Sequence, residues 1–82
     1  MRLIENKKES IAELDIIATG GKIKQFMDDK GISIRELSKV MNVSFQSVYK
    51  WQKGESLPTV NNFYILGQIL GIDIDDMLVA RE

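Results

Sequence analysis

The sequence has no cysteine and no histidine among its 82 residues. These two absences exclude disulfide bonds, thiol chemistry, the usual zinc sites and acid–base catalysis by imidazole. A chain of this length has room for one domain only, and without covalent or metal staples that domain needs a well-packed core.

Long apolar runs are also missing, because no stretch approaches the roughly 18 residues that span a membrane. The first residues, MRLIENKKES, lack the apolar block of a signal peptide. We therefore expect a cytoplasmic protein with no membrane partner.

An excess of one charge is missing as well, since the formal net charge is −1. The charges are nevertheless unevenly spread: residues 22–53 hold seven basic and three acidic side chains (+4), whereas the remainder holds four basic and nine acidic ones (−5). Such a polarised domain can present a positive face to an anionic partner. Charge alone favours the plainer interpretation, in which the lysines only keep a helical surface hydrated.

Six glycines and one proline separate segments that have helical periodicity. Ser33 and Glu36 form a capping box, Asn42 tolerates the positive φ of a sharp turn, and Gly31 and Gly54 suit helix C-termini. Helices are predicted at about 21–30, 34–41, 45–53, 60–70 and 74–80, with Ser33, Ser44, Thr59 and Asp73 as N-caps.

Residues 1–19 fit neither a helical nor a strand period, so we expect an N-terminal arm there and a folded domain over residues 20–82. The four residues Thr19–Lys22 are interpreted as a turn into the first helix. A phosphate-binding loop is disfavoured, because the upstream glycine and the spacing of that motif are missing.

The segment 32–54 reads as two short helices joined by about three residues. Steps of about 100° around the second helix place Lys50 at about 40° and Lys53 at about −20° from Gln46, whereas Val48 and Trp51 fall on the opposite side. An ordinary amphipathic surface helix would show the same division. The helix immediately before it favours a unit that docks on its own domain and offers long polar side chains to a partner.

Several short motifs occur in one order: GKIKQFMDDKGIS, ELSKVMNVSFQSVYKWQKG, a loop with Pro58, NNFYILGQILGI and IDDML. From Gly21 to Val79 the sequence thereby resembles the phage-repressor and Cro type of helix-turn-helix domain, the lambda-repressor-like family. The resemblance implies an all-α fold, a compact five-helix domain preceded by a short arm. It also implies a transcriptional regulator that binds double-stranded DNA as a homodimer on a pseudo-palindromic site. The sequence itself identifies no cofactor, no metal site and no small-molecule effector.

Carried over position by position, the base-reading positions of the family fall on Phe45, Gln46 and Lys50. Gln46 can bond to adenine N6 and N7, Lys50 can reach guanine O6 and N7, and Phe45 can contact a thymine methyl. Phosphate contacts are expected from Lys22, Arg35, Ser44, Ser47 and Lys53.

The sequence departs from the family pattern at three places. Ile34 stands where many members have a glutamine that meets a phosphate, and Phe45 replaces a polar base reader. Met27 and Gln52 stand where many members pair an arginine with an acid, and both partners are absent together, so no buried charge is left unpaired.

A second function stays open from the sequence alone. The chain could be an antitoxin-like or adaptor module that keeps the fold without specific DNA binding and uses Phe45, Tyr49 and Trp51 against a partner chain. The sequence pI of about 5.4 and the expected exposure of Phe45 motivate this alternative.

We do not expect an enzyme. Asp28–Asp29 and Asp75–Asp76 could suggest the paired carboxylates of an active site. Neighbours on a helix, however, point about 100° apart and do not readily share a substrate. A solvated face or a helix cap explains them.

Overall fold

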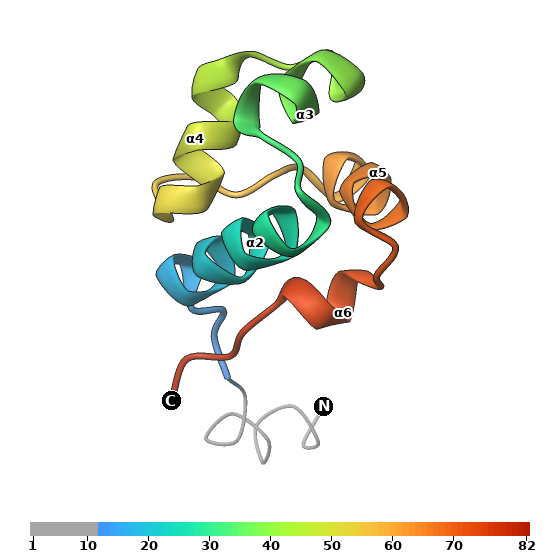
Figure 1. The fold of residues 1–82 in the computed structure, drawn as a ribbon. Helices are drawn as coiled ribbons and strands as arrows, with labels where there is room; N and C mark the ends of the chain where they lie inside the picture. Colours follow the sequence, from blue (N-terminus) through green and yellow to red (C-terminus); the bar gives the residue numbers. More distant parts are fainter. Residues whose placement is uncertain (1–11) are drawn as a thin grey trace.

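The computed structural model describes residues 12–82, which fold into five α-helices, labelled α2 to α6 in Figure 1. Within that range the backbone forms no strand beyond one isolated antiparallel bridge between Leu14 and Ala80. The all-α, five-helix prediction is thus confirmed, while residues 1–11 of the predicted arm lie outside the described residues. The helices are α2 Ile16–Lys30, α3 Ile34–Met41, α4 Phe45–Lys53, α5 Val60–Leu70 and α6 Ile74–Met77.

Helix α2 occupies the centre of the fold and contacts α4, α5 and α6, while α3 packs on α4 and α5 (Figure 1). Every helix contributes to one hydrophobic core, whose burial supplies the main driving force for folding. The buried residues of this core are Ile23, Met27, Leu37, Met41, Val48, Trp51, Phe63, Leu66, Leu70 and Met77.

The predicted helix ends are confirmed where they depend on local chemistry. Ser33 Oγ accepts from the Glu36 N–H (3.1 Å), and Glu36 Oε1 accepts from the Ser33 N–H (2.9 Å), which is the reciprocal capping box. Asn42 ends α3 in the left-handed conformation with φ 57°. Gly31 and Gly54 end α2 and α4 with φ 74° and 75°, where a side chain would be strained.

The start of α2 corrects the sequence interpretation. The helix begins at Ile16, and the Asp15 side chain caps it by accepting from the Ala18 N–H (2.9 Å). The predicted turn at Thr19–Lys22 is therefore wrong, because these residues lie inside the helix. Gly20 serves helix packing instead: a Cβ at this position would overlap the Trp51 carbonyl oxygen, so its absence lets α2 approach the end of α4.

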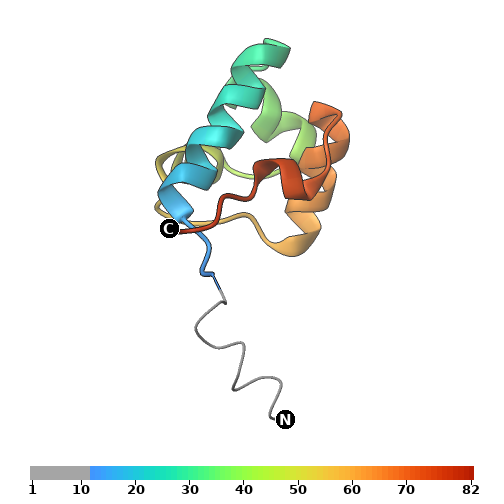
Figure 2. The same ribbon diagram turned by 90° about the horizontal axis from the view of Figure 1, so that it is seen from below.

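The last helix is shorter than predicted, since α6 ends at Met77 instead of continuing to Ala80. The following residues pair with the segment before α2: the Asp15 N–H donates to Val79 O (2.7 Å) and the Arg81 N–H donates to Glu13 O (2.6 Å). Figure 2 shows the C-terminal segment returning to the start of α2. Residues 13–15 of the expected arm are therefore held against the C-terminal segment.

None of the helices within residues 12–82 is both long enough and apolar enough to cross a lipid bilayer.

Candidate nucleic-acid interface

The turn between α3 and α4 sets the direction of the second helix. The left-handed Asn42 reverses the chain, and the Val43 N–H donates to Ser38 O (3.0 Å), which closes the end of α3. Ser44 then caps α4 by accepting from the Ser47 N–H (3.0 Å). Three residues thus join the two helices, as the sequence predicts, and these hydrogen bonds satisfy the end of α3 and the start of α4.

One side of α4 is buried in the core. Val48 is fully buried and Trp51 is 4% exposed, and α4 packs against both α2 and α3. The burial of Trp51 also weakens the partner-chain alternative, because one of the three aromatic side chains proposed to meet a partner is not accessible.

The opposite side of α4 presents Gln46, Lys50 and Lys53, which we name the polar edge, and all three are exposed. Within residues 12–82 the ion pairs are Lys24–Asp28 and Arg81–Glu13, so neither lysine of the polar edge is neutralised by an acidic side chain. Phe45 and Tyr49 lie beside this edge and are 49% and 44% exposed.

The first turn of α4 has the groups and the charge distribution that favour binding of an anion. The hydroxyl oxygens of Ser44 and Ser47 lie 2.8 Å apart, and the turn contains no acidic residue. Backbone hydrogen bonding to the Ser44 carbonyl begins with the N–H groups of Ser47 and Val48, so the preceding N–H groups carry the positive end of the helix dipole. A phosphate oxygen is a suitable partner for such a helix start.

The other two cations predicted to contact phosphates, Arg35 and Lys22, differ in their position relative to α4. Arg35 is exposed on the first turn of α3. Lys22 lies on α2 about 200° around the helix from Gly20, the residue that touches α4. Its ammonium group lies 5.8 Å from the centre of the Phe26 ring. The structure therefore gathers six of the eight predicted site residues on or directly before α4, adds Arg35 from the neighbouring helix, and turns Lys22 away from α4.

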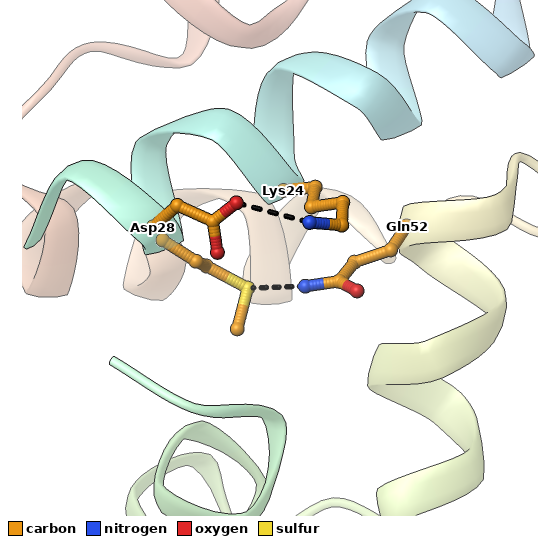
Figure 3. Close-up of polar contacts among 4 residues, drawn as sticks. Lys24, Asp28 and Gln52 are labelled. Atoms are coloured by element: carbon orange, nitrogen blue, oxygen red, sulfur yellow. Dashed lines mark hydrogen bonds and ion pairs between the residues drawn. The ribbon is translucent and has the colours of Figure 1, made fainter. Parts of the chain in front are cut away.

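Lys24 is a cation that the sequence analysis did not single out. It lies on the same side of α2 as Gly20 and is drawn beside Gln52 of α4 in Figure 3. Its ammonium group pairs with the Asp28 carboxylate at 3.0 Å, and both side chains are largely exposed. The i, i+4 spacing to Asp28 is a sequence signal that could have identified this pair.

Met27 and Gln52, the two departures from the family's charged pair, contact each other. Gln52 Nε2 donates a hydrogen bond to Met27 Sδ at 3.2 Å, which joins α2 to α4 (Figure 3). Met27 is 1% exposed, and thioether sulfur is a weak acceptor. A weak uncharged contact thus occupies the place of an ion pair, and no buried side-chain polar atom in residues 12–82 lacks a partner.

The entry to α3 contains the third departure. Ile34 is half-buried and packs against the core, so its side chain offers no polar group at the position where a glutamine was expected. The neighbouring capping box lowers the pKa of the Glu36 carboxyl below its usual value, because the Ser33 backbone N–H and hydroxyl hydrogen-bond to Glu36.

A surface groove of about 410 Å³ lies between α5 and α6. Asp73 and Asp76 contribute to its lining, and none of its lining residues belongs to α3 or α4. Carboxylates disfavour an anionic ligand, so we do not include this groove in the nucleic-acid interface. The described part of the chain also gathers no cluster of three or more acidic residues that could hold a metal ion.

A family model described as helix-turn-helix matches residues 23–77. None of the curated proteins matches the chain in sequence.

Similar solved structures share the fold at low sequence identity. The clp gene regulator ClgR from Corynebacterium glutamicum is 24% identical with a TM-score of 0.69, and the match covers 74% of this chain but only 65% of that chain. The restriction-modification controller protein C.AhdI from Aeromonas hydrophila is 19% identical with a TM-score of 0.71, covering 77% of this chain and 96% of that one. The hypothetical transcription factor NHTF from Neisseria is 21% identical with a TM-score of 0.69, covering 85% and 86%.

Proposed function

The chain belongs to the helix-turn-helix family whose model matches residues 23–77, and we propose that it is a transcriptional regulator that binds double-stranded DNA sequence-specifically through α4. The observation that supports this most is the division of α4 into two sides. Val48 and Trp51 are buried on one side, and the other exposes the polar edge, whose lysines form no ion pair with an acidic side chain of residues 12–82. An α-helix with its side chains is about 10–12 Å wide and enters a major groove about 12 Å wide.

The base contacts are assigned to the exposed side chains of the first two turns of α4. Gln46 offers a donor and an acceptor that match adenine N6 and N7, and Lys50, one turn further on, is a donor for guanine O6 and N7. Phe45 brings an apolar ring beside them. These three residues discriminate between sequences in this proposal.

The phosphate contacts position α4 without reading sequence. Ser44 and Ser47 offer hydroxyl and backbone donors at the helix start, Lys53 lies at its end, and Arg35 lies on α3. Lys22 is a weaker member of this set, since it lies on the far side of α2 from α4.

We further propose that two copies bind a pseudo-palindromic site as a homodimer. One α4 covers only a few base pairs, and two-fold symmetry places a second α4 in the next major groove about 34 Å along the duplex. Two proteins with similar structures, the clp gene regulator ClgR and the hypothetical transcription factor NHTF, accord with a regulatory role.

Selection from a pool of random duplexes tests the proposal. The expected result at low salt is enrichment of one site with two related half-sites. The logarithm of the affinity for this site should fall linearly with the logarithm of the salt concentration, by about 0.9 per neutralised phosphate. If repeated rounds enrich no site, α4 is not a sequence reader.

A further inference from the structure

Phe45 and Tyr49 form a second exposed edge of α4, distinct from the polar edge. They are four residues apart, so their side chains differ by only about 40° around the helix, and this aromatic edge lies about 100° from the line through Gln46 and Lys50. Phe45 is 49% exposed and Tyr49 is 44% exposed. The Lys53 ammonium lies 5.6 Å from the centre of the Tyr49 ring and closes this edge at the end of the helix.

The aromatic edge has no structural role in the core. Neither Phe45 nor Tyr49 belongs to the buried core or to the half-buried residues that pack against it. An aromatic side chain has some 150–250 Å² of surface to bury, so leaving two rings half in water forgoes a large stabilisation. Because the aromatic edge adjoins the polar edge on the exposed part of α4, a duplex bound along Gln46 and Lys50 would lie next to these rings.

The major groove of DNA contains one apolar group, the C5 methyl of thymine. The two rings are separated by about 6 Å along the helix axis, at about 1.5 Å per residue. Successive bases of one strand are about 3.4 Å apart, so the rings span about two base steps. The spacing of the aromatic edge therefore fits a pair of C5 methyl groups on neighbouring or next-neighbouring pyrimidines.

We propose that the aromatic edge reads thymine methyl groups, with Phe45 on one 5-methylpyrimidine and Tyr49 on a second within about two base steps. This inference rests on the proposed DNA binding and specifies its ligand: a site whose half contains thymines flanking the bases that Gln46 and Lys50 contact. Lys53, held over the Tyr49 ring, then lies next to the phosphates of the same strand.

Replacement of single thymines by deoxyuridine in the selected duplex tests this reading, because deoxyuridine keeps every hydrogen-bonding group and loses only the methyl. We expect two thymine positions in each half-site at which deoxyuridine weakens binding of the full chain about fourfold. This factor corresponds to about 0.8 kcal/mol for one buried methyl group. All other deoxyuridine substitutions should leave the affinity unchanged.

The assignment to each ring is tested by combining the duplexes with protein variants. In Phe45→Ala one of the two deoxyuridine effects should disappear, and in Tyr49→Ala the other should disappear, because the methyl then has no ring to contact. Tyr64→Ala is the matched control, since Tyr64 is an exposed aromatic residue (61%) on α5, and both effects should persist in it. Near-ultraviolet circular dichroism of Trp51 verifies that each variant is folded.

Three results overturn the inference in different ways. If the protein binds its selected duplex but no deoxyuridine substitution weakens binding, the aromatic edge does not read methyl groups, and the proposed function stands. If the effects persist in Phe45→Ala and Tyr49→Ala, another group contacts the methyls. If no duplex is enriched at all, both the inference and the proposed function fail.

Discussion

Two adjacent glycines in α2 should respond in opposite ways to the same substitution. In Gly20→Ala the new Cβ would overlap the Trp51 carbonyl oxygen and lie 2.9 Å from both Gln52 O and Gly54 N. These are backbone atoms, which cannot rotate away, so α2 and α4 must separate. Overpacking of this kind costs about 1–3 kcal/mol or more. With about 2 kcal/mol as the central value, a destabilisation of about 1 kcal/mol remains after the roughly 1 kcal/mol that alanine gains over glycine within a helix.

Gly21→Ala is the matched control. A Cβ at Gly21 meets no atom of residues 12–82 within 4 Å, and the residue lies within the same helix. Its substitution should therefore stabilise the fold by about 0.5–1 kcal/mol, through the higher helix propensity of alanine and the lower entropy of the unfolded chain.

Thermal unfolding followed by the fluorescence of Trp51, the single tryptophan, measures both effects. For a domain of this size, 1 kcal/mol shifts the melting temperature by about 4–8 °C. We expect the melting temperature of Gly20→Ala to fall by about that amount and that of Gly21→Ala to rise by about half of that amount or more. Equal stability of the two variants would refute the close approach of α2 to α4 at Gly20.

Three further predictions concern the interface and its supports. Gln46→Ala should cost about 1–3 kcal/mol of binding at one base position, whereas Lys53→Ala should weaken all duplexes alike and reduce the salt slope by about 1; titrations of specific and random duplexes at several salt concentrations separate the two. The lowered pKa of Glu36 means that its carboxylate stabilises the fold above its usual pKa of 4.5 and loses this contribution as the pH falls through the folded-state pKa. Urea midpoints of Glu36→Gln should therefore fall less between pH 7 and pH 3 than those of the parent chain, and equal losses would contradict the capping box. Met27→Arg should destabilise the fold by about 3 kcal/mol by burying an unpaired charge, and adding Gln52→Glu should recover at least about 1 kcal/mol; additive losses in a double-mutant cycle would contradict the contact between the two side chains.

The features that the sequence predicted correctly depend on residues close together in the chain. The capping box needs only Ser33 and Glu36, and the turn needs only Asn42 and the cap at Ser44. The two sides of α4 follow from a period of 3.6 residues. Each of these features is stable within one or two helical turns, so a local pattern is sufficient to identify it.

The errors concern features that distant contacts decide. Thr19–Gly20–Gly21 has the composition of a turn, yet Gly20 is a helical residue whose missing side chain accommodates α4, more than 30 residues away in sequence. The end of α6 was misplaced for the same reason, because the segment after Met77 pairs with residues 13–15.

The candidate site shows the same division between local and distant information. The exposure of Gln46 and Lys50 could be predicted from the helical period, and the structure agrees with it. The contact between Met27 and Gln52, and the orientation of Lys22 away from α4, depend on how α2 packs on α4. A single sequence contains no direct signal for that packing. The DNA contacts of all these residues remain predictions.

In the proposed complex, the outer side of α4 is the surface that meets duplex DNA. Backbone amide spectra of the full chain, recorded while the selected duplex is added, test it residue by residue. We expect the largest shifts from Ser44 to Lys53 and at the start of α3, and no shifts in the groove between α5 and α6. Shifts concentrated at Tyr64, Gly71 and Asp73 of that groove, with α4 unchanged, would mean that α4 is not the DNA-binding surface.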